Sequence, residues 1–264
     1  MKPLDAITDA VWSSVAGVAT DLDDTLTHEG RLTVTALAAL GELSAMGVPC
    51  VIATGRPLGW AAVVASIAPV RAAVAENGGA WVVREERGVR VAFRDPEPSR
   101  REGIERCQAM VERLTREFPA LRRVEEYTAR VTDIALDVGE KADVPRALVE
   151  AALARVREAG LYGVASSIHL HVSAHAPDKT AGLRRALEDL GLDAGALESR
   201  WIYLGDSPND AGPFAQMQLS VGVRGVERFA DASPAMPKYV TSGGAGEGIA
   251  EVVARLRHAR RSSR

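Results

Sequence analysis

The chain has 264 residues, of which 47% are hydrophobic and 25% charged, proportions that are ordinary for a folded globular protein. This length allows one large domain or two modest ones, and the formal net charge of −3 gives no general attraction to nucleic acid or to an anionic membrane. The N-terminus has no basic segment followed by a sustained apolar stretch, and the apolar stretch 57–70 is too short to cross a bilayer. We therefore expect a cytoplasmic protein without a nucleic-acid or membrane partner.

The first part of the chain alternates short apolar runs with segments of helical periodicity. The runs at 15–20, 48–53 and 72–76 predict buried strands, and the segments 32–46 and 57–67 between them predict helices. Repeated strand–helix units indicate parallel strands joined by right-handed crossovers. The same rhythm returns near the C-terminus, with a helix from Lys179, strands at 201–204, 219–223 and 239–241, and a last helix from about residue 248.

The middle of the chain has a different pattern. It reads as a hairpin at 80–94, a helix with an apolar stripe over 104–118, strands at 121–127 and 131–138, a helix at 144–159, and strands at 161–165 and 168–173. This order favours an antiparallel sheet with helices on one face. We therefore expect an α/β fold in which a Rossmann-like parallel-sheet core, residues 1–80 and 177–264, carries an inserted α+β module, residues 81–176, with hinges at 78–80 and 174–178.

The first predicted strand stops on three carboxylates within four residues, Asp21, Asp23 and Asp24. Carboxylates repel one another and are costly to desolvate, so folding stability alone does not favour this cluster. A divalent cation with oxygen ligands removes the objection, and alternation along an extended chain lets Asp21 and Asp23 project the same way. The pattern alone is equally compatible with an acidic helix cap on a polar loop.

Other polar clusters follow the remaining core strands or open a helix. Thr54 follows the second strand, Lys179 opens a helix, and Asp206 and Asp210 follow the strand at 201–204. Ligands of open α/β sheets bind beyond the carboxyl ends of the strands, so these clusters are expected to meet. Phosphoryl transfer needs this mixture, because carboxylates hold Mg²⁺ while hydroxyl and ammonium groups neutralise the phosphoryl oxygens. Asp21, Asp206 and the backbone of Asp23 are plausible ligands of the metal.

Taken together and in order, these clusters resemble the motifs of the haloacid dehalogenase (HAD) superfamily. The matching stretches are Asp21-Leu22-Asp23-Asp24-Thr25-Leu26-Thr27, Ala53-Thr54-Gly55-Arg56, Glu76-Asn77-Gly78, Asp178-Lys179-Thr180 and Gly205-Asp206-Ser207-Pro208-Asn209-Asp210. The inserted module is similar to the C2B-type cap of subfamily IIB, the branch with Cof-type, sucrose-phosphate and mannosyl-3-phosphoglycerate phosphatases. Asp24 departs from that branch, which commonly has glycine there, and we take it as a solvent-facing or cap-closing residue.

The resemblance implies a Mg²⁺-dependent phosphatase that hydrolyses a small phosphorylated metabolite, a sugar phosphate or a phospho-acid, through an aspartyl-phosphate. Asp21 would be the nucleophile and Asp23 the general acid and base, while Thr54 and Lys179 would hold the phosphoryl group. The implied metal site consists of Asp21, Asp23, Asp206 and Asp210. The implied substrate-binding residues are Thr54, Gly55, Arg56, Asn77, Lys179, Asn209 and His171.

Several alternatives stay open at this point. Arg56 can be a solvated surface residue, Asn77 can serve only a turn, and His169 and His171 can lie on a solvated strand face instead of lining a pocket. A phosphomutase similar to phosphomannomutases uses the same cap type and the same chemistry, and the fold also permits a non-catalytic binding protein. We expect a monomer or a homodimer.

Overall fold

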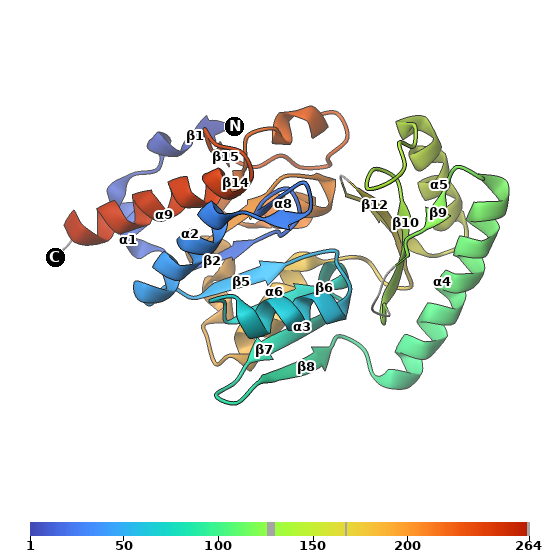
Figure 1. The fold of residues 1–264 in the computed structure, drawn as a ribbon, viewed down its shortest axis with the longest axis horizontal. Helices are drawn as coiled ribbons and strands as arrows, with labels where there is room; N and C mark the ends of the chain where they lie inside the picture. The colour runs from blue at the N-terminus through green and yellow to red at the C-terminus, as the bar shows by residue number, and fades with distance from the viewer. Residues whose placement is uncertain (126–129, 167, 263–264) are drawn as a thin grey trace.

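The computed structural model describes residues 1–125, 130–166 and 168–262, which form a larger α/β unit and a smaller α+β unit (Figure 1). Within these ranges the larger unit is built on a nine-stranded sheet in the order β1-β15-β14-β13-β2-β5-β6-β7-β8. Its strands are β1 (Lys2–Pro3), β2 (Gly17–Thr20), β5 (Cys50–Ala53), β6 (Ala72–Ala75), β7 (Ala80–Arg84), β8 (Val89–Phe93), β13 (Trp201–Gly205), β14 (Leu219–Gly222) and β15 (Tyr239–Val240). A short pair, β3 (Thr27–His28) and β4 (Arg31–Leu32), follows the first acidic cluster.

The centre of the larger sheet is parallel. Neighbouring strands from β14 through β13, β2 and β5 to β6 all pair in parallel, as the strand–helix rhythm predicts. Every residue of these five strands is buried. Helices on both faces exclude water from the sheet, which explains why these strands are apolar runs without alternation.

Two helical layers cover this sheet and form a separate apolar core on each face. One layer consists of α1 (Asp9–Ser14), α2 (Val34–Ala45), α3 (Leu58–Ile67) and α9 (Ala245–Ser262), and the other of α6 (Lys179–Asp189), α7 (Leu197–Arg200) and α8 (Ala211–Gln216). The start of α6 is fixed by the side chain of Asp178, which accepts a 2.9 Å hydrogen bond from the backbone N–H of Ala181. This cap places Lys179 in the first turn, next to the sheet edge. None of the helices in the described ranges is long and apolar enough to cross a lipid bilayer.

The smaller unit is an antiparallel sheet covered on one face by two helices. Its strands lie in the order β11 (Tyr162–Ala165), β12 (His169–Ser173), β10 (Asp133–Asp137) and β9 (Arg122–Arg123), and its helices are α4 (Glu97–Glu117) and α5 (Arg146–Glu158). Apolar residues of both helices and of the sheet form a third core between them. Figure 1 shows α4 and α5 on the side of this sheet that is turned away from the larger unit. The predicted α+β architecture is confirmed, while residues 126 and 127 of the expected strand 121–127 lie outside the described ranges.

The hairpin at 80–94 does not belong to the smaller unit. Strand β7 pairs antiparallel with β6, and β8 pairs antiparallel with β7, so both extend the larger sheet. That part of the prediction was wrong, because alternation shows that a strand has one buried face but not which sheet it joins. The chain therefore first crosses to the smaller unit after Phe93, beyond the expected boundary at 80–81 and the expected hinge at 78–80. The expected second linker, 174–178, does connect β12 to α6.

Candidate active site

Four neighbouring strands of the larger sheet end in polar residues at the same edge. Asp206 follows β13, Asp21 follows β2, Thr54 follows β5, and Asn77 lies in the turn after β6. Since these strands are parallel and adjacent, their carboxyl ends bring the four side chains to one side of the molecule. The helix α6 packs beside β5 and β6 and adds Lys179 to the same edge.

Lys179 is held between two buried carboxylates. Its Nζ lies 2.9 Å from Oδ1 of Asp21 and 2.7 Å from Oδ1 of Asp210. Asp210 also accepts a 2.5 Å hydrogen bond from the hydroxyl of Tyr203 and two more, of 3.0 and 3.2 Å, from the backbone N–H groups of residues 206 and 207. Asp210 therefore fixes the position of Lys179, and Lys179 in turn lies directly against Asp21.

Burial changes the proton affinity of these groups strongly. Burial raises the pKa of Asp21 to about 8, even though Lys179 acts in the opposite direction. Burial, reinforced by the charge of Asp210, also raises the pKa of Asp206 well above its ordinary value. For Lys179 burial alone would lower the pKa, but Asp21 and Asp210 together hold it above its ordinary value, so its ammonium group stays charged at neutral pH. The raised pKa values of Asp21 and Asp206 mean that both groups are held as carboxylates at neutral pH only where further positive charge joins Lys179.

The aspartate cluster fits a metal ion. Oxygen atoms of Asp21, Asp206 and Asp210 lie within 4.8 Å of one another. Within the described part of the chain, Oδ1 of Asp206 is buried without a hydrogen-bond partner, and Oδ1 of Asp21 has only its ion pair with Lys179. A buried carboxylate oxygen without a donor is costly, and a hard divalent cation would satisfy it. Because Asp210 already accepts four hydrogen bonds, Asp21 and Asp206 fit best as direct ligands and Asp210 as their support.

The turn after β13 is built to hold Asp210 and Asn209 in place. A side chain at Gly205 would collide with the carboxylate of Asp210, so glycine is needed for this close approach. Ser207 and Asp210 form a reciprocal capping box at the start of the short 3₁₀ helix Pro208–Asp210. The amide of Asn209 donates a 3.3 Å hydrogen bond to Oδ1 of Asn77, which links this turn to the end of β6.

Arg56 is buried and connects the two units, so the solvated interpretation of this residue was wrong. Its Nε and Nη2 atoms donate hydrogen bonds of 2.9–3.1 Å to both carboxylate oxygens of Asp23. Its Nη1 donates a 3.2 Å hydrogen bond to Glu140 of the smaller unit. The Thr54 hydroxyl accepts a 3.0 Å hydrogen bond from the backbone N–H of Arg56, which leaves its own proton available for a ligand.

The two histidines of β12 face the larger unit and are almost fully buried, so the solvated-face alternative was also wrong. Nδ1 of His171 lies 2.9 Å from Oδ2 of Asp133, and Nε2 of His169 lies 2.9 Å from Oε2 of Glu140. Burial lowers the pKa of His171 to about 4 although Asp133 opposes the shift, so the ring is neutral at pH 7. Gly55 permits the contact between the units, since a side chain there would place its Cβ 2.9 Å from Nε2 of His171.

A small cavity lies between the two units at this point. It measures about 10 Å³ and is lined by residues of both units, namely Asp21, Asp23, Gly55, Ser166, Ile168, His169, His171, Ser207 and Asn209. A space of this size holds about one water molecule and no phosphate ester.

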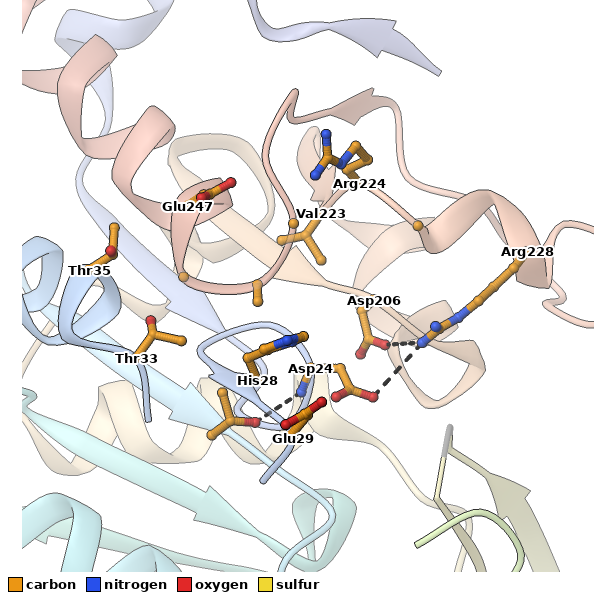
Figure 2. Close-up of a pocket in the computed structure, with 15 residues that line it drawn as sticks. Asp24, His28, Glu29, Thr33, Thr35, Asp206, Val223, Arg224, Arg228 and Glu247 are labelled. Atoms are coloured by element: carbon orange, nitrogen blue, oxygen red, sulfur yellow. Dashed lines mark hydrogen bonds and ion pairs between the residues drawn. The ribbon is translucent and has the colours of Figure 1, made fainter. Parts of the chain in front are cut away.

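A larger hollow of about 620 Å³ lies on the outer side of Asp206. Figure 2 shows Arg228 at its edge, pointing toward Asp206 and Asp24. The Nη2 atom of Arg228 lies 3.4 Å from Oδ2 of Asp206 and 3.8 Å from Oδ2 of Asp24. Asp24, which departs from the expected motif, thus faces this open side and shares a cation with Asp206.

The structure brings Asp21, Lys179, Asp206 and Asp210 together. Among the described residues the Asp23 carboxylate is not part of the metal-compatible group, because it is bound to Arg56, and the other predicted residues lie around this centre. Tyr203, Glu140 and Arg228 contact this group but were not predicted. Tyr203 is one residue of an apolar strand, and Glu140 and Arg228 lie in polar connections, so neither periodicity nor motif spacing distinguishes them. Their contacts arise only when segments far apart in the sequence meet.

Comparison with known proteins places this geometry in a family. The sequence family described as haloacid dehalogenase-like hydrolase matches residues 18–95. A protein of Methanothermobacter thermautotrophicus named phosphoglycolate phosphatase is 32% identical over 244 residues, which cover 90% of this chain and 97% of that protein. A protein of the same name from Methanosarcina acetivorans is 29% identical over 235 residues, covering 88% of this chain and 92% of that one. The chain belongs to the haloacid dehalogenase-like hydrolases.

Solved structures show that this HAD-like hydrolase has the fold of HAD subclass IIB. A Thermoplasma acidophilum protein superposes with a TM-score of 0.70 at 14% identity, covering 92% of this chain and 98% of that one. The sucrose-phosphatase of Synechocystis sp. PCC6803 gives a TM-score of 0.65 at 16% identity, over 91% and 97% of the two chains. A subclass IIB sugar phosphatase gives 0.62 at 18% identity, over 91% and 98%. These structures show that the chain has the IIB architecture, while the family match and the relatives named phosphoglycolate phosphatase support a phosphoric monoester hydrolase.

Proposed function

We propose that this HAD-like phosphatase hydrolyses a small phosphorylated carboxylic acid of the phosphoglycolate kind, with Mg²⁺ and through a phosphoryl group carried by Asp21. The observation that carries the proposal is the environment of Asp21, a buried carboxylate 2.9 Å from the Lys179 ammonium and within 4.8 Å of Asp206. The substrate class is supported by the relatives named phosphoglycolate phosphatase, which match along nearly the whole chain. It is also supported by Arg56, a cation beyond the phosphate site that can bind a second anionic group.

In the first half of the reaction a carboxylate oxygen of Asp21 attacks phosphorus, and the bond from phosphorus to the substrate oxygen breaks. Asp23 gives a proton to that departing oxygen. Lys179 and the Thr54 hydroxyl donate hydrogen bonds to the phosphoryl oxygens and stabilise the charge that develops on them. Arg56 donates to both oxygens of Asp23, which fixes the position of this side chain and favours the carboxylate form that accepts the proton from water in the second half.

In the second half a water molecule replaces the departed alcohol. Asp23, now a carboxylate, takes a proton from the water as its oxygen attacks phosphorus, and the bond between phosphorus and the Asp21 oxygen breaks. Phosphate leaves, and Asp21 and Asp23 return to their starting states. Asn209 and Asn77, which are joined by a hydrogen bond near this position, are suited to contact the phosphate or the leaving group.

Asp21, Asp206 and the backbone carbonyl of Asp23 are the groups that would hold Mg²⁺. When bound, the ion supplies positive charge that offsets repulsion between the phosphate and the carboxylates. Asp210 contributes indirectly, because it anchors both Lys179 and the turn that carries Asp206. These assignments use only oxygen donors, which is the ligand set that Mg²⁺ prefers.

We assign the smaller unit the role of a cap that closes over the substrate. It covers the carboxyl edge of the core sheet, and the cavity beneath it, about 10 Å³, is too small for any substrate unless the cap moves. Closure would exclude bulk water from the phosphoryl group. The connections around residues 94–96 and 174–178 are the places where the chain can bend during this movement.

The proposal is tested by measuring phosphate release from a panel of phospho-acids and sugar phosphates with Mg²⁺, for the wild type and Asp21→Asn. Release by the wild type alone, and fastest from 2-phosphoglycolate, is the expected result, since the amide of asparagine cannot attack phosphorus. Transfer of the phosphoryl group to a second sugar position instead of water would assign a phosphomutase. Binding without turnover of any panel member would assign a non-catalytic protein.

A further inference from the structure

The cap carries a carboxylate that occupies the cationic end of the closed site. Glu140 follows β10, and its two carboxylate oxygens accept hydrogen bonds from two different partners, Arg56 of the core at 3.2 Å and His169 of the cap at 2.9 Å. The hydrogen bond from His169, followed by the charge of Arg56, lowers the pKa of Glu140 to about 2 despite partial burial. Glu140 is therefore ionised at neutral pH, and His169 must donate from Nε2, because a carboxylate only accepts.

Glu140 lines an outer hollow of the smaller unit, and its two partners connect it to the residues around Asp21. His169 lines the same cavity as Asp21 and Asp23, and Arg56 is bound to Asp23. The guanidinium group of Arg56 binds two carboxylates: Nε and Nη2 donate hydrogen bonds to Asp23, and Nη1 donates one to Glu140. The Nη1 group of Arg56 and Nε2 of His169 are thus two convergent donors that can hold one carboxylate without disturbing the general acid.

We infer that Glu140 is an internal stand-in for the carboxylate of a phospho-acid substrate, and that Arg56 and His169 form the subsite that selects such substrates. This inference rests on the proposed function. When the cap opens, Arg56 stays with the core and Glu140 leaves with the cap, so their contact breaks. When the cap closes over a phospho-acid, the substrate carboxylate takes the two donors and Glu140 turns toward solvent, to which its side chain is already 31% exposed.

Competition between Glu140 and the substrate carboxylate for Arg56 and His169 predicts a specific effect on substrate choice. An ester with an uncharged tail leaves Glu140 on its two donors, whereas a phospho-acid must displace it. Removing the charge of Glu140 therefore favours the acid over the neutral ester. Removing the His169 donor does the reverse, because the substrate carboxylate then loses a partner that the neutral tail never used.

The experiment compares kcat/KM for 2-phosphoglycolate with kcat/KM for 2-hydroxyethyl phosphate, in which a CH₂OH group replaces the carboxylate. The ratio of the two values is expected to rise about ten-fold in Glu140→Gln, mainly through KM for the acid, and to fall at least about ten-fold in His169→Phe. Glu112→Gln is the matched control, since it removes the same charge from an exposed position of α4 and should leave the ratio unchanged. Inhibition by glycolate, which has the carboxylate but no phosphate, should strengthen in Glu140→Gln.

The outcomes separate the inference from the proposed function. A ratio that stays at the wild-type value in Glu140→Gln would overturn the inference even if both esters are hydrolysed, because a simple latch or a structural role changes both values equally. If His169→Phe does not fold, the ratio of kcat/KM values in Glu140→Gln and the inhibition of this variant by glycolate still test the inference. A wild-type protein that hydrolyses neither ester nor any other panel member would contradict the proposed function, and the inference with it.

Discussion

The hydroxyl of Tyr203 is a sensitive point of the site, although it does not line the cavity. It donates a 2.5 Å hydrogen bond to Asp210, and the whole side chain is buried in β13. Burial and the Asp210 charge raise the pKa of this hydroxyl well above its ordinary value, so it remains a donor at any physiological pH. Replacing Tyr203 with phenylalanine removes this donor and keeps the ring, which packs edge to face against Phe214 with 6.0 Å between the centroids.

The size of the effect follows from the charge of the acceptor. A hydrogen bond to a charged group contributes about 1.5–3 kcal/mol to the free energy of unfolding. Asp210 keeps its bonds from Lys179 and from the two backbone amides, so no acceptor is left unpaired. At about 2–4 °C per kcal/mol for a chain near this size, the expected loss in Tm is about 3–12 °C. The value of kcat should fall as well, since Asp210 then holds Lys179 less firmly against Asp21.

Thermal and urea unfolding followed by circular dichroism, together with steady-state kinetics, measure both effects. Tyr162→Phe is the control, because Tyr162 is exposed in β11 and the change should stay within about 0.5 kcal/mol. If Tyr203→Phe behaves like this control in stability and in kcat, the idea that Asp210 depends on Tyr203 to position Lys179 is refuted.

Two further predictions concern the charges around the site. Arg228→Gln should tighten Mg²⁺ binding several-fold in calorimetry, because the Arg228 guanidinium lies against Asp206 and Asp24 and competes with the ion for their charge. Arg224→Gln, at the same hollow, is the control. Equal Mg²⁺ affinity in the two variants would contradict this prediction. The pKa of Glu140 is lowered from 4.5 to about 2 in the folded protein, so its contribution to stability is present above 4.5 and is lost as the pH falls toward 2. The Tm of the wild type should therefore exceed the Tm of Glu140→Gln near neutral pH, and this difference in Tm should disappear on acidification. A difference in Tm that does not depend on pH would show that the Glu140 charge is not involved.

The sequence predicted the parts of the fold and site that depend on short-range patterns. The apolar runs and helical stripes identified the parallel core, and the polar residues after Thr20, Ala53 and Leu204 identified the catalytic edge, because strand direction alone decides where a strand's last residues lie. The hairpin of β7 and β8 was assigned to the wrong unit, since two sheets can offer the same apolar face to an alternating strand.

The contacts between the units could not be predicted in the same way. Solvated side chains were open alternatives for Arg56 and His169, yet both are buried where the two units meet. Glu140 and Arg56 are 84 positions apart in the sequence, so the periodicity of neighbouring residues cannot predict their contact. Such residues are specified by the docking of one unit on the other, which depends on the whole fold.

The central claim, that Asp21 carries the phosphoryl group, is tested most directly by trapping the intermediate. The enzyme is mixed with 2-phosphoglycolate and Mg²⁺, quenched in acid within the first turnover, reduced with borohydride and analysed by peptide mass spectrometry. An acyl phosphate at Asp21 is reduced to homoserine, so the account predicts homoserine at position 21 in the wild type mixed with substrate and none in the wild type mixed without it. Rapid phosphate release with an unmodified Asp21 at every quench time would contradict the account and assign direct attack by water.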